Sequence, residues 1–428
     1  MFAYIKGNFI TNRKKGGEEM NYLSGNLELM HELNTKQILR VIRQFNPISR
    51  SEIVEKTNLT AATVSRIVSK LIEFNLVTET GYGESSGGRK PILLELNPGA
   101  VLTVGIDLEI DEIKGLIIDL NGRVLLEDNL SIKGEREQDH IINRVIEIIK
   151  KLLSKKDYRS RVTGIGIGMH GLVDYARGIS IFPPAFGWRD IPVADMIKKE
   201  FDLPVIIENN VRALTLAENW FGMAKDLNNF ICLKVGSGIG SGIFTDGKLY
   251  RGASNSAGEI GHTMVDEDGP LCSCGNYGCL ESMASIPAIV KRTVKALKQG
   301  ADSKINSMVN NLKEINEETV FLAAKQGDQL AGQVLQDTGR YLGIGIANLI
   351  NILNPEVVII GGDIVLAGDI ILESMRSTVH NRALSYPAEH VKIINSRMGK
   401  EGVAIGAAAL ILESVFNIGH NINVDIGL

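Results

Sequence analysis

Cysteine, aromatic residues and net charge are all scarce in this sequence. It has 428 residues, of which four are cysteine and 5% are aromatic, and its formal net charge is -4. No run of about eighteen apolar residues is present, so we expect no membrane span. The weak charge gives no whole-chain case for nucleic-acid binding, so charge has to be judged segment by segment. The 44% hydrophobic content is typical of a globular protein, and the length suggests about two or three domains.

Three of the four cysteines lie within one short stretch. His262 is followed by Cys272, Cys274 and Cys279 in the spacing H-x9-C-x-C-x4-C. These four side chains are the ligands that a closed, tetrahedral, structural Zn2+ site uses. The alternative is a disulfide with one spare thiol. Because no signal peptide opens the sequence, we expect a cytoplasmic location, where disulfides are rare, and the pattern therefore predicts zinc.

Residues 34–75 carry three helical patterns with a short connection between the second and the third. The expected caps are, in order, Asn34 or Thr35, Ser49 or Ser51, and Thr60. The third pattern places Val64, Ile67, Val68, Leu71 and Ile72 on one apolar face. This arrangement is typical of a helix-turn-helix, whose last helix enters the DNA major groove by its N-terminal end. A small structural bundle is the alternative.

A hairpin follows the three helices. Short apolar strands at residues 76–80 and 92–96 flank a glycine-rich turn that contains Gly87 and Gly88, and this pattern predicts a wing. Between residues 35 and 96 nine Lys or Arg stand against six Glu, a local charge of +3. The expected DNA contacts are Thr60, Ala62, Thr63, Ser65, Arg66 and Lys70 in the third helix, and Arg89 and Lys90 in the wing.

Residues 1–32 have no clear period and are expected to form a tail. The run GGEEM, which ends at Met20, is typical of a translated ribosome-binding sequence, so the start at Met20 and a native tail both remain open.

Two further stretches resemble one family. The glycine-rich residues 233–262 end in GEIGH and are followed by CxCGxxGCLE at residues 272–281, and both resemble the ROK family of bacterial repressors, open reading frames and sugar kinases. The head places the chain nearest to the family's transcriptional regulator branch, similar to xylose-type repressors. The resemblance implies an α/β fold, in which an N-terminal winged helix-turn-helix precedes a two-lobed actin-like (ribonuclease H-like) sugar kinase fold. Its expected parts are a tail (1–32), a head (33–96), a first lobe (97–208 with 404–420), and a second lobe (209–403) with the zinc knot and a helical insertion.

The resemblance implies a sugar pocket. Asn209, Glu259, His262 and Glu281 stand at positions that the family uses to bond sugar hydroxyls. Carboxylates suit this task because their hydrogen bonds to neighbouring hydroxyls are charge-assisted. The alternative for the two glutamates is salt bridges on a surface knot. Trp188 either stacks on a sugar face or packs in the core.

Catalytic chemistry, in contrast, is expected to be lost, and we expect no catalytic residues. The family's kinases carry Glu-Asn-Asp where this chain has Asn210 in the third position, and an amide cannot act as a general base. Their first phosphate loop reads Asp-Ile-Gly-Gly-Thr-Lys, whereas residues 107–112 read DLEIDE. The missing glycines prevent close approach of the backbone to phosphate, and the added carboxylates repel it.

These features predict a sugar-responsive transcriptional regulator, most simply a repressor of carbohydrate-use genes that sugar releases from operator DNA. The expected partners are operator DNA, a small sugar and a second copy of the chain in a dimer or tetramer. A ROK-type kinase that phosphorylates a hexose with ATP is the alternative, as are control by a sugar-transport protein and a body that never touches DNA. The sequence does not distinguish among glucose, xylose, N-acetylglucosamine and β-glucosides.

Overall fold

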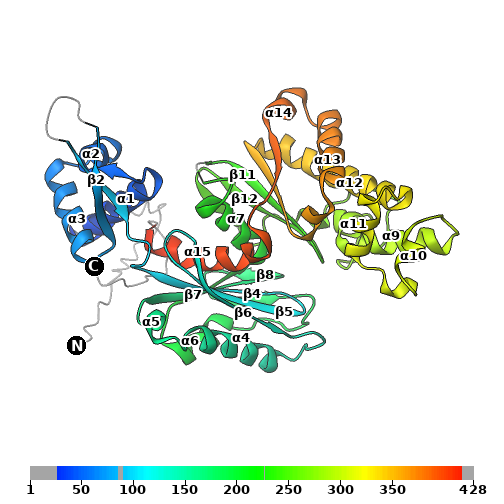
Figure 1. Cartoon of the computed structure of the whole chain (residues 1–428), viewed down its shortest axis with the longest axis horizontal. Coiled ribbons are helices and arrows are strands. Elements are labelled where there is room, and N and C mark those ends of the chain that lie inside the picture. The colour runs from blue at the N-terminus through cyan, green and yellow to red at the C-terminus, as the bar shows by residue number, and fades with distance from the viewer. Residues whose placement is uncertain (1–26, 85–89, 226, 417–428) are drawn as a thin grey trace, which may run out of the picture.

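The computed structural model describes residues 27–84, 90–225 and 227–416. Figure 1 shows a small head at one end of the long axis, two α/β lobes beside it, and a group of helices at the opposite end. Within these described ranges no helix combines the length and the apolar character needed to cross a membrane.

The head consists of three helices and a three-stranded sheet in the order β1-β3-β2. Its elements are α1 Leu27–Gln44, β1 Ile48–Ser49, α2 Arg50–Thr57, α3 Ala61–Glu73, β2 Val77–Tyr82 and β3 Ile92–Leu96. Helix α2 begins with a capping box: the Ser49 hydroxyl accepts from the backbone N–H of Glu52, and the Glu52 carboxylate accepts from the backbone N–H of Ser49. Val64, Ile67 and Leu71 of α3 are buried, as their spacing predicts.

The first helix begins earlier than the sequence pattern predicts. Helix α1 starts at Leu27, inside the segment expected to be a tail. The expected cap Thr35 instead lies within the helix, where its hydroxyl donates to the carbonyl of His31 at 2.8 Å. This back-bond satisfies threonine without ending the helix, which explains why a capping residue was misleading here.

The first lobe is built on a five-stranded sheet in the order β10-β7-β4-β5-β6. Its elements are β4 Leu102–Leu108, β5 Glu112–Ile118, β6 Val124–Ser131, α4 Gln138–Leu152, α5 Lys156–Arg159, β7 Val162–Met169, β8 Leu172–Asp174, β9 Ile179–Phe182, α6 Val193–Phe201, β10 Val205–Asn209 and the closing α15 Gly402–Phe416. Helix α7 Asn210–Phe221 follows β10 and packs between this lobe and the second. Strands β4, β7 and β10 are parallel, and β4, β5 and β6 are antiparallel.

The second lobe repeats this sheet plan in the order β13-β12-β11-β14-β15. Its elements are β11 Phe230–Val235, β12 Ile239–Thr245, β13 Lys248–Tyr250, η1 Ile260–His262, α8 Leu280–Ala284, α9 Ile286–Lys298, α10 Ile305–Met308, η2 Leu312–Glu314, α11 Glu317–Lys325, α12 Gln329–Leu353, β14 Val357–Gly361, η3 Asp363–Ala367, α13 Asp369–Arg382, α14 Ser385–His390, β15 Lys392–Asn395 and η4 Gly399–Glu401. In both lobes an antiparallel meander of three strands is extended by two parallel strands. The two lobes are therefore versions of one fold.

Helix α15 lies flat on the first lobe's sheet and runs toward the head (Figure 1). Glycines in the sheet make this possible, because a Cβ on Gly105 would lie 1.9 Å from the carbonyl oxygen of Ala404. A Cβ on Gly166 would meet the carbonyl of Ala407 at 1.7 Å. Helix α15, the last described segment, is thus packed tightly against the sheet of the first lobe.

Candidate sugar, metal and DNA-binding sites

The turn between β10 and α7 holds the first residue of the predicted sugar pocket. The Oδ1 atom of Asn209 accepts hydrogen bonds from the backbone of Val211 at 2.9 Å and of Arg212 at 3.3 Å, so Asn209 is the N-cap of α7. Its Nδ2 atom donates to the carbonyl of Gly171 at 3.1 Å. Asn209 therefore has a structural role in addition to the predicted contact with sugar.

A buried ion-pair network lies directly beside this cap, and the sequence analysis did not identify it. The carboxylate of Glu208 is fully buried and accepts from Arg212 at 3.0 Å and from Arg251 at 2.7 Å. Arg212 also donates to the carbonyl of Asn255, in the loop that leads to Glu259. The network joins the first lobe to the second beside the predicted sugar-binding turn. The i, i+4 spacing of Glu208 and Arg212 is the one sequence signal that was available.

The two predicted glutamates belong to the same region but have different surroundings. Glu281 accepts from the backbone of Ile239 at 3.0 Å and from the hydroxyl of Ser273 at 3.2 Å. Glu259 reaches solvent at the start of η1. Partial burial raises the pKa of the Glu259 carboxyl above its ordinary value, while His262 and Arg212 oppose the shift. Glu259 is thus the carboxylate with fewer structural ties.

Trp188 packs in the first lobe. It is 7% exposed, its Nε1 atom donates to the Ser180 hydroxyl at 3.1 Å, and its ring lies 4.8 Å from that of Phe186. These contacts favour the packing alternative over stacking on a sugar.

The predicted zinc ligands converge. The ligand atoms of His262, Cys272, Cys274 and Cys279 all lie within 4.8 Å of one another. The sulfur of Cys272 lies 3.6 Å from Nδ1 of His262, and the sulfur of Cys274 lies 3.6 Å from that of Cys279. A tetrahedron with Zn–S bonds of about 2.3 Å has edges of about 3.7 Å, so the donor set fits zinc in both chemistry and size. No cysteine among the described residues is in a disulfide.

A cavity of about 520 Å³ lies between the lobes, beside the segment 107–112 that was compared above with the phosphate loop of the family's kinases. We call it the phosphate side of the cleft. Its charged lining consists of the carboxylates Asp107, Glu109, Asp111, Glu112, Glu317 and Asp363 and the lysines Lys114, Lys234 and Lys400. Lys234, from β11, forms an ion pair with Glu109, from the turn after β4. Carboxylates therefore outnumber cations in this cavity, and Lys234 is already paired, so the cavity is poorly suited to nucleotide phosphates.

Three carboxyl and imidazole groups near this cavity are shifted from their usual ionisation. Burial, reinforced by the charge of Glu109, raises the pKa of Asp107 well above its usual range. Burial likewise opposes the charge of Glu109, but Lys234 outweighs it and lowers the pKa of that carboxyl. Burial also lowers the pKa of His170, which favours its neutral form.

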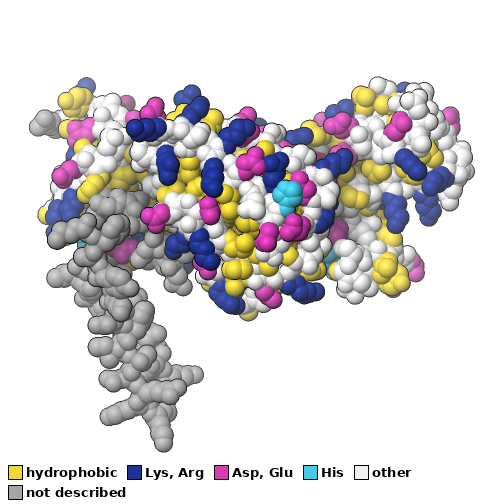
Figure 2. Space-filling model, turned by 90° about the horizontal axis from the view of Figure 1, so that it is seen from below, with side chains coloured by type: hydrophobic (Ala, Val, Ile, Leu, Met, Phe, Trp, Pro, Cys, Tyr) yellow, Lys and Arg dark blue, Asp and Glu magenta, His cyan; other side chains and the backbone are white. Residues whose placement is uncertain are grey.

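Helix α3 presents most of the predicted DNA contacts to solvent. Thr60, Ala62, Ser65, Arg66 and Lys70 are exposed, whereas Thr63 is half-buried. The Thr60 side chain accepts from the backbone of Thr63 at 3.2 Å and caps the helix. In the wing Lys90 is exposed, and Gly87, Gly88 and Arg89 lie outside the described residues. Over the body, Lys and Arg are interspersed with Asp and Glu on the face in Figure 2.

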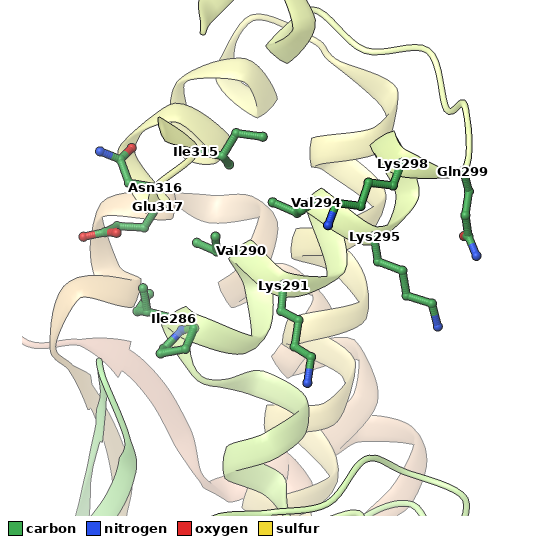
Figure 3. Close-up of a pocket in the computed structure, with 11 residues that line it drawn as sticks. Ile286, Val290, Lys291, Val294, Lys295, Lys298, Gln299, Ile315, Asn316 and Glu317 are labelled. Atoms are coloured by element: carbon green, nitrogen blue, oxygen red, sulfur yellow. The ribbon is translucent and has the colours of Figure 1, made fainter. Parts of the chain in front are cut away.

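A larger cavity of about 710 Å³ lies along α9 in the helical insertion. Figure 3 shows Val290 and Val294 across from Ile315, whereas Lys291 and Lys295 extend away. The predicted sugar-binding residues do not line it. Its apolar wall is not suited to a polyhydroxylated ligand, so we do not assign the sugar to it.

The fold and these sites define a two-part protein, in which a winged helix-turn-helix head is joined to a body of sugar-kinase type. The ROK family model matches residues 103–414, and a winged helix-turn-helix DNA-binding model matches residues 32–78. The chain is 34% identical to the xylose repressor of Caldicellulosiruptor bescii over 92% of this chain and 98% of the relative. This chain therefore belongs to the ROK family, and the predicted resemblance is confirmed.

Solved structures agree on the architecture. A ROK family transcriptional regulator, described as a homologue of the E. coli MLC protein, is 32% identical with a TM-score of 0.80, over 91% of this chain and 97% of that one. A ROK family glucokinase from Streptomyces griseus, in complex with glucose and AMPPNP, is 28% identical with a TM-score of 0.66, over 72% of this chain and 98% of that one. The glucokinase matches almost entirely while covering less of this chain, which is consistent with the extra N-terminal head here.

Proposed function

We propose that this protein is a sugar-responsive transcriptional repressor, whose head binds operator DNA and whose body binds a sugar that releases it. One observation supports the proposal most directly: an exposed recognition helix is joined to a kinase-type body that keeps the predicted sugar-binding residues, while Lys234 in the cavity between the lobes is already paired with Glu109. The relation to a xylose repressor supports the same reading. The parts are the head (33–96, with α1 extending it to residue 27) and the two lobes (97–208 with 404–420, and 209–403).

The proposed sugar contacts are Asn209, Glu259, His262 and Glu281, and the sugar would be a monosaccharide or small glycoside with adjacent hydroxyls. The cap made by Asn209 and the ion pairs of Glu208 hold the turn between β10 and α7 in place. Such fixed polar groups bind a ligand with little ordering cost.

The proposed metal is one structural Zn2+ held by His262, Cys272, Cys274 and Cys279. Zinc binding would close the loop between η1 and α8. This loop leads directly to Glu281, in the first turn of α8. The chemistry that zinc supplies here is only structural, because four protein ligands complete its coordination.

Phosphoryl transfer is not part of the proposal. Asn210 stands where the family's kinases have their base, and an amide cannot act as a general base. The alternative, a ROK-type hexose kinase, is disfavoured because the cleft lacks both a base and a neutral phosphate cradle. Assembly into a dimer or tetramer is proposed because winged heads usually read two half-sites. A sugar-transport protein as a further partner is kept as an alternative route of control.

Two measurements test the proposed function. Thermal unfolding with D-xylose, D-glucose, N-acetylglucosamine and a β-glucoside should identify a sugar that raises the melting temperature. That sugar should then weaken binding to an operator duplex, selected from genomic fragments by the purified protein, about 5- to 150-fold. Glu259→Gln should abolish the response and leave sugar-free operator binding intact, whereas Glu389→Gln, an exposed substitution on α14, should change neither. A bound sugar without effect on operator affinity would contradict sugar control.

A further inference from the structure

Helix α7 begins at the predicted sugar-binding turn and ends against the DNA-binding head. It runs from Asn210 to Phe221, and its twelve residues span about 18 Å. Its first turn is held by the cap from Asn209 and by the ion pair between Arg212 and Glu208. A change at the sugar site therefore acts directly on the start of this helix.

The body of α7 is clamped between the two lobes. All of its residues from Asn210 to Trp220 are buried. On one side, a Cβ on Gly406 of α15 would lie 1.8 Å from the carbonyl oxygen of Ala213. On the other, a Cβ on Gly242 of β12 would lie 1.9 Å from the hydroxyl of Thr215. A helix packed this closely on both sides cannot slide past its neighbours by small steps, so a rearrangement of the lobes has to move α7 as a unit.

The far end of α7 reaches the head, and Trp220 makes a defined contact there. The Nε1 atom of Trp220 donates to Glu413 at 2.7 Å, and its ring lies edge-on to Phe416 at 5.4 Å, so α15 orients the indole. The guanidinium of Arg43 lies 3.9 Å from the centre of the Trp220 ring. Arg43 belongs to the last turn of α1, the helix that also places Ile38 and Ile42 in the core of the head.

We propose that α7 carries the sugar signal to the head, and that Arg43 and Trp220 are the positioning residues that transmit it. The inference rests on the proposed function and specifies its route. A cation over an indole face is a directional contact, since the attraction is lost when the cation leaves the face. Movement of the Trp220 end of α7 therefore changes the orientation in which α1 holds α3 toward DNA. Neither residue touches sugar or DNA in this scheme.

Arg43→Met tests the contact, because methionine keeps an unbranched apolar chain and removes the charge over the indole. Lys36→Met is the matched control, since it removes a cation from the same helix whose ion pair, with Glu32, stays within α1. The readouts are operator affinity with and without the sugar found above, and sugar affinity of the free protein. For Arg43→Met we expect sugar affinity to be unchanged, sugar-free operator affinity to stay within about threefold, and the coupling factor to fall below about twofold. Lys36→Met should retain the full coupling factor.

Trp220→Phe should reduce the coupling factor in the same way, and the double variant should lose no more than either single one, because both remove one contact. If the wild type couples and Arg43→Met couples equally, the inference is overturned while the proposed function stands. If the wild type binds sugar without coupling, the proposed function fails instead.

A second readout does not depend on sugar. The chain has two tryptophans, so Trp188→Phe leaves Trp220 as the sole indole. Operator binding alone should then shift the emission of Trp220, and Arg43→Met should remove that shift. Unchanged Trp220 emission on saturation with operator would overturn the inference, whatever the sugar does.

Discussion

Lys234 balances one of the carboxylates that line the cavity between the lobes. It lies on β11 and pairs with Glu109, which stands 125 residues earlier in the chain and in the other lobe. Burial works against the charge of Lys234, but Glu109 and Asp107 outweigh it and raise the pKa of the amino group. The Asn210 side chain also helps to lower the pKa of the Glu109 carboxyl. The pair of Lys234 and Glu109 thus links the two lobes.

The zinc ligands make the sharpest prediction for single residues. Cys272→Ser should lose the metal and lower the melting temperature, because the loop between η1 and α8 then loses its central cross-link. Elemental analysis of the wild type should give about one zinc per chain, and the variant should give close to none.

Cys232→Ala is the matched control for this change, since Cys232 is a buried cysteine of β11 that lies outside the cluster. It should keep its zinc. A wild-type protein purified without metal, yet with normal sugar binding, would refute the assignment.

Among the elements, α3 combines a buried face with an exposed one. Its apolar side completes the core of the head, while Arg66 and Lys70 face solvent on the other side. The Thr60 cap fixes where the helix begins, and therefore which side chains lie at the end that enters a groove. The wing differs in role, since Lys90 lies in a loop that suits phosphate or the minor groove.

This difference predicts distinct responses to mutation. Arg66→Ala should weaken operator binding by about 1–3 kcal/mol and affect random DNA less, if it contacts base edges. Lys90→Ala should weaken binding to both DNAs alike and reduce the salt slope by about one unit. Fluorescence anisotropy over a range of salt concentrations measures both. Footprinting of an operator by a body that lacks residues 1–96 would contradict the assignment of DNA binding to the head.

For the whole molecule, the body has the fold of a ROK family glucokinase, whereas a relative that matches the chain over almost its full length is a xylose repressor. Two lobes with matching sheets enclose a cleft, and α15 ties the second lobe back to the first sheet. A similar body in the Streptomyces griseus glucokinase is crystallised with glucose and AMPPNP. In the proposed scheme, movement of the lobes would change the orientation of the added head. Helices α1 and α7 meet where head and body join.

We therefore expect no sugar-dependent ATP turnover. Asn210→Asp should not restore it, because the first phosphate loop still carries Glu109, Asp111 and Glu112 and lacks glycine. Coupled measurement of ADP release, with a working hexokinase as positive control, tests both proteins. Turnover of about 1–100 per second, typical of kinases, would show that the alternative function is correct.

Local features of the chain were predictable because they depend on neighbours in sequence. The caps at Ser49 and Thr60, the buried face of α3 and the convergence of the zinc ligands all arise within a few turns or one short loop. The order of the lobes followed from motif resemblance. Each of these was available before any long-range contact was known.

Other features depend on how distant segments pack, and periodicity carries no information about them. Trp188 is a core residue because Ser180 and Phe186 lie beside it. The pairs Lys234–Glu109 and Arg43–Trp220 join different domains or lobes. Such pairs form only when the chain closes on itself, since an isolated charge or indole has no preferred partner until burial removes the competing water.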